Sequence, residues 1–360
     1  MTKDGKIGIG IIGFGGIATG AHAPGYRRIS DQCEILAVAD ILPERCAVAT
    51  GEKWNIPLAF EDYKKLLEID EIDAVSVCTP NYVHMQPTLD ALAAGKHVLC
   101  EKPMAINADE AKRMLEGAKN AGKKLQIGYN MRFSAGAQGL KRAMDAGVLG
   151  EVYHAQARAM RRRGVPGWGV FIDKEKQGGG PLIDIGVHIT DMTLWLMGHP
   201  KPVAASGKTF TKFGTKPGVV GMMGKWDHTK YTVEDFAVAL IRFEDGRTMN
   251  LTSSFIANLD KERFDTHLFG TGAGAFLDAN ASQFTLYREE FGTLTDSTPG
   301  WLPRVESSHG EEIKMFVKAV RDGVEPESLG AASGEQALMV TQIMDAIYAS
   351  SEQNKEVAIR

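Results

Sequence analysis

Short apolar runs alternate with amphipathic stretches along the first third of the chain. Runs of this kind are typical of strands that are buried on both faces of a sheet. The runs that predict such strands are 7–12, 34–39, 73–78, 97–100 and 125–129. Helices are expected between them, over 17–29, from Pro43, from Pro87 to Gly95, and from Asn107 to Gly122. Because strands that alternate with helices form βαβ units, we predict a doubly wound parallel sheet covered on both faces.

The pattern changes after residue 129. Alternating apolar and polar residues predict strands at 233–243 and 247–257, joined by a hairpin turn at Glu244-Asp245-Gly246. Two more strands are expected between 263 and 287, and helical patterns lie at 133–146, 181–197, 310–322 and 333–350. We therefore predict an α/β protein with two domains: residues 1–129 with the parallel sheet, and residues 130–360 with an α+β fold and a mostly antiparallel sheet.

The composition is that of a globular protein and excludes several classes. The 360 residues suffice for about two domains, and 44% of them are hydrophobic. A net charge of −4 argues against a dedicated nucleic-acid binder. The four cysteines form no CxxC pair and no zinc spacing, so no metal is expected. The sequence contains no recognisable signal peptide or membrane span, and we expect a cytoplasmic protein without membrane contact.

A glycine-rich turn follows the first predicted strand. Gly13-Phe14-Gly15-Gly16-Ile17-Ala18 fits the pattern GxGxxA. Gly13 permits a tight turn, Gly15 lets the backbone approach a pyrophosphate, and Ala18 allows close packing of helix on strand. The N-terminus of the following helix favours a bound anion. Because the turn opens a strand–helix–strand unit, it predicts a dinucleotide-binding site.

Asp40 ends the second predicted strand. A carboxylate at this point accepts hydrogen bonds from both hydroxyls of an adenosine ribose and repels a 2′-phosphate. The next three residues are not basic, although Arg45 is near enough in sequence to reach the site. NAD is therefore favoured over NADP. The alternative is that Asp40 only caps the end of its strand.

Two polar segments follow later strands of the predicted parallel sheet. They are Thr79-Pro80-Asn81 and Glu101-Lys102-Pro103. Ligands of open α/β sheets bind at the carboxyl ends of strands, so Lys102 is placed to reach a substrate oxygen. Alternatively, Lys102 lies in a solvated turn. His84 either contacts the cofactor or caps a turn.

Asp184 and His188 stand four residues apart on the predicted helix 181–197 and share one of its faces. An imidazole can accept a hydroxyl proton, and a carboxylate can fix its tautomer and orientation. The alternatives are a pair on the helix surface or, with further ligands, a metal site.

An arginine run, Arg161-Arg162-Arg163, precedes a Gly/Pro-rich loop that contains Trp168. The run is either a solvated strand end or a rim that binds cofactor phosphate or an anionic substrate. Trp168 either stacks on a sugar or nicotinamide face or fills the space between the domains.

In combination these segments resemble the Gfo/Idh/MocA oxidoreductases, the glucose–fructose oxidoreductase and inositol dehydrogenase family. The resemblance runs nearly end to end. The segments that carry it are GFGGIA near the N-terminus, AVADILPER at Asp40, VCTPNYVH at 77–84, GKHVLCEKP at 95–103, GYNMRF at 128–133, GGGPLIDIGVH at 178–188 and VEDFAVALIRFEDG at 233–246.

The resemblance implies an N-terminal Rossmann domain and a C-terminal domain whose large open sheet forms dimers or tetramers. It places the family's catalytic lysine on Lys102 and its Asp-x-x-x-His pair on Asp184 and His188. The implied cofactor contacts, with those of the glycine turn, are Gly13, Phe14, Gly15, Gly16, Ile17, Asp40, Arg45, Thr79, Pro80, Asn81, His84, Glu101 and Lys102. Candidate substrate contacts are Arg132, Arg163 and Trp168.

The implied activity is hydride transfer between NAD(P) and a secondary alcohol or ketone of a sugar, an inositol or a related cyclic polyol. In this interpretation His188 takes the hydroxyl proton, Asp184 orients His188, and Lys102 holds the same oxygen. Two alternatives stay open. One is a redox-assisted glycosidase or lyase that regenerates its NAD, and the other is a non-catalytic NAD-binding regulatory protein.

Overall fold

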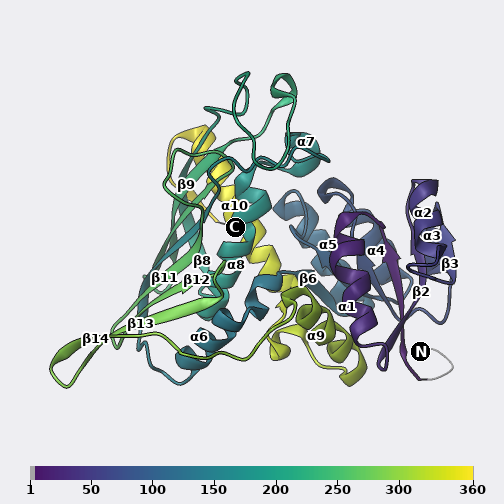
Figure 1. Cartoon of the computed structure of the whole chain (residues 1–360), viewed down its shortest axis with the longest axis horizontal. Coiled ribbons are helices and arrows are strands. Elements are labelled where there is room, and N and C mark those ends of the chain that lie inside the picture. Colours follow the sequence, from purple (N-terminus) through teal and green to yellow (C-terminus); the bar gives the residue numbers. More distant parts are fainter. Residues whose placement is uncertain (1–4, 360) are drawn as a thin grey trace. The chain divides into compact units, whose positions relative to one another are not determined.

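Figure 1 shows the computed structural model of the chain, which describes residues 5–359. The chain forms two compact units. The first contains the described residues up to Asn130 together with Glu306–Leu338, and the second contains Met131–Val305 with the described residues from Met339 onward. The segment Glu306–Leu338, which the sequence pattern placed with the second domain, thus belongs to the first unit.

The first unit is built on a seven-stranded sheet in the order β15-β6-β5-β4-β1-β2-β3. All neighbours pair in parallel except β15, which is antiparallel to β6. The predicted parallel sheet is confirmed. Its strands are β1 (Ile7–Ile12), β2 (Cys33–Ala39), β3 (Leu58–Phe60), β4 (Ala74–Val77), β5 (His97–Glu101), β6 (Leu125–Gly128) and β15 (Ala332–Ser333).

Local signals set the ends of several helices in this unit. The Asn107 side chain accepts a hydrogen bond from the Glu110 amide at 2.9 Å, and the helix ends at Gly122 in the left-handed conformation. The predicted helix over 17–29 is divided into a π-helical turn and a short α-helix. The helices are η1 (Ala18–His22), α1 (Ala23–Arg28), α2 (Pro43–Thr50), α3 (Tyr63–Leu67), α4 (Met85–Ala93), α5 (Ala108–Ala121) and α9 (Ser308–Asp322).

Helix α9 completes the core of the first unit. In Figure 1 it lies beside α1, and its side chains Ile313, Phe316 and Val317 are buried in one cluster with residues of β1. A β-carbon at Gly25 of α1 would come within 2.5 Å of the Ile313 side chain, so the two helices pack closely. Sequence periodicity predicts such a helix but not which domain it covers.

The second unit is built on a nine-stranded sheet in the order β14-β13-β12-β11-β7-β10-β9-β8-β16. It is antiparallel except where β10 runs parallel to β7, so the expected mostly antiparallel sheet is confirmed. The strands are β7 (Val152–Met160), β8 (Pro202–Phe210), β9 (Phe236–Phe243), β10 (Thr248–Ser254), β11 (Arg263–Gly270), β12 (Gly274–Asp278), β13 (Gln283–Glu290), β14 (Thr293–Ser297) and β16 (Val357–Ala358).

Helices cover one face of this sheet. The predicted helix 181–197 is present, but its first turn, η4 (Leu182–Gly186), is π-helical and only α8 (Val187–Leu196) is α-helical. A hydrogen bond of 2.7 Å between the hydroxyls of Thr193 and Thr266 ties α8 to β11. The other helices are α6 (Ala135–Asp145), α7 (Lys174–Gln177) and most of α10 (Gly334–Gln353). Within residues 5–359, no helix combines the length and hydropathy needed to cross a membrane.

Candidate active site

The glycine turn after β1 has the geometry that a dinucleotide requires. Gly13 has a φ of 87°, and a β-carbon there would lie 2.7 Å from the carbonyl oxygen of Cys78, so only glycine fits. A β-carbon at Gly16 would meet no atom within 4 Å, which leaves this side of the turn open. The Phe14 ring is buried edge-on to Trp54 at 5.9 Å, so Phe14 offers its backbone rather than its side chain.

The Asp40 carboxylate closes this turn. Its Oδ2 accepts hydrogen bonds from the Phe14 amide at 2.8 Å and from the Arg45 guanidinium at 3.1 Å, and its Oδ1 accepts from the Leu42 amide at 3.0 Å. Asp40 is buried, whereas the Arg45 side chain is about half exposed. The structure therefore brings the turn, Asp40 and Arg45 together. Both sequence interpretations of Asp40 fit, because the carboxylate caps the strand end and also lies where a ribose binds in such folds.

The catalytic-lysine candidate directly follows β5. The Lys102 amide donates to Glu101 Oε2 at 3.2 Å, and Glu101 Oε1 lies 2.8 Å from His22 Nε2. Burial by itself raises the pKa of Glu101, but the His22 hydrogen bond and the positive charge of Lys102 outweigh it and lower that pKa. Glu101 is thus a buried carboxylate that contacts the backbone of Lys102.

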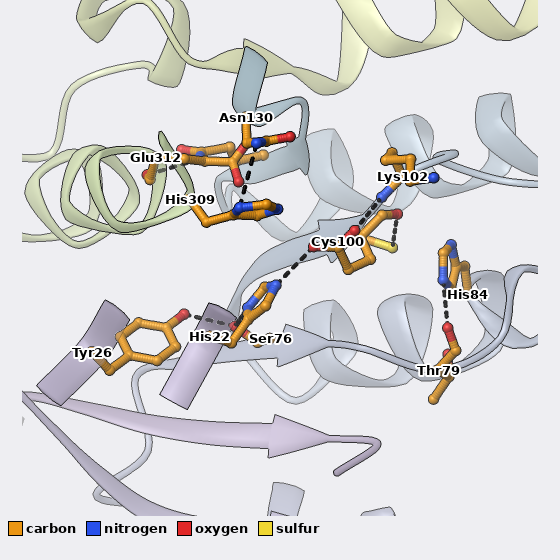
Figure 2. A network of polar contacts seen from close by, with 12 residues as sticks. His22, Tyr26, Ser76, Thr79, His84, Cys100, Lys102, Asn130, His309 and Glu312 are labelled. Atoms are coloured by element: carbon orange, nitrogen blue, oxygen red, sulfur yellow. Dashed lines mark hydrogen bonds and ion pairs between the residues drawn. The ribbon is translucent and has the colours of Figure 1, made fainter. Parts of the chain in front are cut away.

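His84 joins the two polar loops that the sequence singled out. Its Nε2 lies 2.9 Å from the carbonyl oxygen of Thr79 (Figure 2). Its Nδ1 lies 2.8 Å from the carbonyl oxygen of Pro103. The ring is completely buried, and burial lowers its pKa. Both ring nitrogens therefore face the protein backbone. Next to Thr79, Pro80 is exposed and Asn81 is half-buried.

Asp184 and His188 lie on the two parts of one helix. Asp184 is buried in the π-helical turn, and His188 is half-buried in the first turn of α8. The Arg161 guanidinium lies 3.5 Å from Asp184 Oδ2 and over the ring of Phe255. Arg161, one residue of the arginine run, thus supplies a positive charge to Asp184, a role that the sequence analysis did not assign.

A second carboxylate, Glu234, holds the start of this helix. Its oxygens accept hydrogen bonds from the amides of Gly180 at 2.9 Å and Leu182 at 3.1 Å, and from the Tyr348 hydroxyl at 2.9 Å. A β-carbon at Gly179 would lie 1.9 Å from the Tyr348 hydroxyl, and one at Gly180 would lie 2.2 Å from the Glu234 carbonyl oxygen. The triple glycine is therefore required by close packing. Both segments are recognisable in the sequence, but no role for Glu234 was predicted from them.

The three candidate substrate contacts have different surroundings. Arg132 is completely buried and binds Asp191 through two hydrogen bonds of 2.7 and 2.6 Å, so its side chain connects the turn before α6 to α8. Arg163 donates to the carbonyl oxygen of Ala257 at 2.9 Å. Trp168 is 55% exposed. The Arg132 guanidinium thus serves a buried ion pair, and no substrate role is assigned to it.

Family models match both parts of the chain. The model described as an oxidoreductase family with an NAD-binding Rossmann fold matches residues 7–129, and the GFO/IDH/MocA C-terminal domain matches residues 137–276. The chain belongs to the GFO/IDH/MocA oxidoreductase family. The predicted family, the two-part α/β fold and the oxidoreductase activity are confirmed.

Relatives of this family member resemble it over almost its whole length. It is 36% identical to D-glucoside 3-dehydrogenase of Escherichia coli over 98% of this chain and 97% of that protein. Myo-inositol 2-dehydrogenase of Thermotoga maritima is 29% identical over 92% of this chain and 93% of its own. Among solved structures, an oxidoreductase domain protein from Kribbella flavida has a TM-score of 0.85, 26% identity and 99% coverage of both chains.

Membership of the family gives the first unit its function. Residues 7–129 form an NAD-binding Rossmann domain. The predicted dinucleotide cofactor is confirmed. The roles of individual residues stay predictions.

Proposed function

We propose that the protein is an NAD-dependent dehydrogenase that acts on a secondary hydroxyl of a sugar, glycoside or cyclic polyol. The observation that carries this proposal is the buried Asp184, charge-paired with Arg161 and followed by His188 on one helix, in a chain that also holds an NAD-binding domain. The names of the relatives, a glucoside dehydrogenase and an inositol dehydrogenase, support the substrate class.

The choice of NAD over NADP rests on Asp40. Its carboxylate is fixed by two backbone amides and by Arg45, so it presents a negative charge where a 2′-phosphate would lie. The Arg45 guanidinium is engaged by that same carboxylate. In this proposal the glycine turn holds the pyrophosphate, and Asp40 holds the adenosine ribose. Bound NAD supplies the acceptor for a hydride.

Three side chains carry the proposed proton chemistry. His188 accepts the proton of the substrate hydroxyl, and Asp184 stabilises the imidazolium that forms. Lys102 donates a hydrogen bond to the same oxygen and stabilises its developing negative charge. Arg161 keeps Asp184 in place through their charge pair. In the reductive direction the protonated His188 returns the proton.

We also propose a homo-oligomer assembled through one face of the nine-stranded sheet. Thr266, the partner of α8, lies on the covered face, and the residues that alternate with it lie on the opposite one. That face carries an aromatic group in which His267 lies 4.5 Å from Phe276 and His154 lies 5.6 Å from Phe269, measured between ring centroids. Light scattering that gives a single species of 39.1 kDa would contradict this assembly. The cytoplasmic location stays a prediction.

The test of the dehydrogenase proposal is a substrate panel. D-glucosides, inositols, free sugars and their keto forms are incubated with NAD or NADH, and NADH absorbance and sugar release are followed together. We expect net NADH formation with at least one secondary alcohol, and its loss in His188→Ala. Release of an aglycone without net NADH would favour the glycosidase or lyase alternative. NAD binding without turnover on any compound would favour the regulatory alternative.

A further inference from the structure

A chain of four buried polar side chains crosses the interior of the first unit. The Tyr26 hydroxyl lies 2.7 Å from Ser76 Oγ, Ser76 Oγ lies 2.9 Å from His22 Nδ1, and His22 Nε2 lies 2.8 Å from Glu101 Oε1. The residues come from α1, β4, η1 and β5 in turn, and all four are buried. Figure 2 shows the chain running toward Lys102.

One arrangement of hydrogens satisfies every member of this chain. Tyr26 donates to Ser76, Ser76 donates to His22 Nδ1, and the Nε2–H of His22 donates to the Glu101 carboxylate. Burial raises the pKa of Tyr26 well above its ordinary value, so its hydroxyl keeps the proton that starts the series. The chain thus selects the His22 tautomer that carries its hydrogen on the nitrogen facing Glu101.

Glu101 is ionised because cationic and donor groups surround it. Burial by itself raises its pKa, and the His22 hydrogen bond is the largest opposing cause, followed by the electrostatic influence of His22, His309 and Lys102. His309 comes from α9, and burial lowers its own pKa, so it is a weak source of positive charge at neutral pH. His22 is therefore the partner on which the Glu101 carboxylate chiefly depends.

The carboxylate in turn fixes the beginning of the loop that bears the lysine. Glu101 Oε2 accepts the backbone amide of Lys102 at 3.2 Å. Gly128 of β6 makes room for this arrangement, because a β-carbon there would lie 3.1 Å from Glu101 Oε1. Other titratable neighbours are His84, whose pKa burial lowers, and the thiols of Cys78 and Cys100, which burial keeps protonated by raising their pKa.

We propose that His22, backed by Ser76 and Tyr26, is a positioning residue that holds Glu101 as a carboxylate beneath Lys102 and so orients Lys102 for hydride transfer. The inference rests on the proposed function for the role of Lys102, but not for the state of Glu101. His22 belongs to the helix that follows the glycine turn, so the same helix serves the dinucleotide-binding turn and the lysine loop.

The first experiment reads Glu101 directly and requires no substrate. The full-length protein is labelled with [δ-13C]glutamate, and the Glu101 signal is assigned by its loss in Glu101→Gln. In the unaltered protein, the chemical shift of this carbon should stay that of an ionised carboxylate even at pH values below the ordinary titration range of glutamate. In His22→Leu, burial is no longer opposed by the hydrogen bond, and the titration moves above the ordinary range. His22→Gln keeps an N–H donor and restores most of the original titration.

Milder variants keep the test valid if His22→Leu does not fold. Ser76→Ala and Tyr26→Phe shift the Glu101 titration in the same direction by a smaller amount. The matched control is Tyr63→Phe, which removes a hydroxyl bonded to Asp90 at 2.6 Å in the same unit and leaves Glu101 unchanged. An unchanged Glu101 titration in folded His22→Leu, Ser76→Ala and Tyr26→Phe overturns the proposal.

The second experiment reads the consequence for turnover on a substrate found in the panel. We expect kcat to fall about 10- to 100-fold in His22→Leu, as when the partner behind a functional group is removed, and to recover largely in His22→Gln. A Glu101 titration that shifts while kcat is unchanged overturns the positioning role of His22. If no substrate is found, the proposed dehydrogenase fails, whereas the titration still decides whether His22 controls Glu101.

Discussion

Two glycine-rich turns of this protein, one in each unit, are closed in the same way and differ in what their carboxylates contact. Asp40 accepts the amide of Phe14 in the first turn and that of Leu42 just after Asp40 itself, and Glu234 accepts the amides of Gly180 and Leu182 at the second turn. A π-helical turn follows each of them, η1 in the first unit and η4 in the second. Such turns are frequent at functional sites.

The difference lies in the third partner of each carboxylate. Arg45 at Asp40 is about half exposed and can be exchanged for a ligand or for water. Tyr348 at Glu234 is itself packed against Gly179, and burial raises the pKa of Glu234. We therefore expect the first turn to receive a ligand, whereas the second holds its own helix. Each of the following predictions tests this distinction.

The largest effect is expected at the helix that the second turn holds. His188→Ala should lower kcat by about 10²- to 10⁴-fold, the usual contribution of a general acid–base group, and leave NADH affinity unchanged. Stopped-flow or steady-state kinetics with a substrate from the panel measures this. His97→Ala is the matched control, since that half-buried imidazole lies at the start of β5 and accepts the Lys124 amide at 3.0 Å. An equal fall in kcat in both variants would contradict the role of His188 as the general acid–base group.

Alanine at one glycine of each turn should separate stability from binding. In Gly180→Ala the new β-carbon meets the Glu234 carbonyl oxygen at 2.2 Å, and we expect about 3 kcal/mol of lost unfolding free energy. In Gly16→Ala no atom lies within 4 Å, so stability should change by less than about 0.5 kcal/mol, while NADH binding weakens. Urea unfolding and NADH fluorescence titration measure the two quantities. Similar stability losses in both variants would contradict the distinction.

The two carboxylates should also respond differently to truncation. Glu234→Ala leaves two buried amides and a tyrosine hydroxyl without their acceptor, and we expect a loss of about 3 kcal/mol in unfolding free energy. Tyr348→Phe removes one of these bonds and should cost only about 1 kcal/mol. Chemical denaturation of both variants tests the ranking, which fails if Tyr348→Phe is the more damaging.

Asp40→Ala should act on cofactor choice. Loss of the carboxylate removes the partner of the ribose hydroxyls and the repulsion of a 2′-phosphate, so NADH affinity should fall about tenfold and the preference over NADPH should narrow. Calorimetric titration with both cofactors measures the ratio. Asp62→Ala is the control, because that exposed carboxylate only accepts the Lys64 amide at 2.9 Å. Tighter binding of NADPH than of NADH by the unaltered protein would overturn the assignment.

The smallest expected effect is on the pH dependence of stability. The raised pKa of Glu234 means that the folded protein keeps a proton which the unfolded chain has lost. Stability from this group is therefore present below the unfolded pKa of about 4.3 and is lost as pH rises through the folded pKa. As pH rises from the unfolded pKa to the folded pKa, the unfolding free energy of the unaltered protein should therefore fall relative to that of Glu234→Gln. Parallel stability curves for the two proteins would show that Glu234 is not shifted.

Local patterns were sufficient to predict the parallel sheet, the glycine turn and the position of Asp40, because each depends on residues close together in sequence. Strand β7 was missed because its covered positions are Ala155, Ala157 and Ala159, whose weak hydrophobicity hides the alternation. Strand β8 also escaped prediction. The partly exposed, three-residue β3 gives no clear apolar run.

The remainder of the site depends on contacts between distant segments. Glu234 reaches Gly180 across 54 positions and Tyr348 across 114, so nothing near the triple glycine shows why it is needed. His22 and Glu101 are 79 positions apart, and their bond was likewise invisible in sequence. Arg132 was expected at the substrate, but its pairing with Asp191, 59 positions away, makes it part of the core. Charge and spacing therefore predicted candidate segments, but not the distant side chains that contact them.

The return of α9 to the first unit has a consequence for how the protein is made. Domains generally fold in the order of their synthesis, N-terminal first. Here the core around β1 includes Ile313, Phe316 and Val317, which leave the ribosome only after the whole nine-stranded sheet except its last edge strand has been translated. Synthesis of the nucleotide-binding unit thus starts first but is completed late. A nascent chain of residues 1–130 therefore exposes an apolar surface that chaperones can recognise.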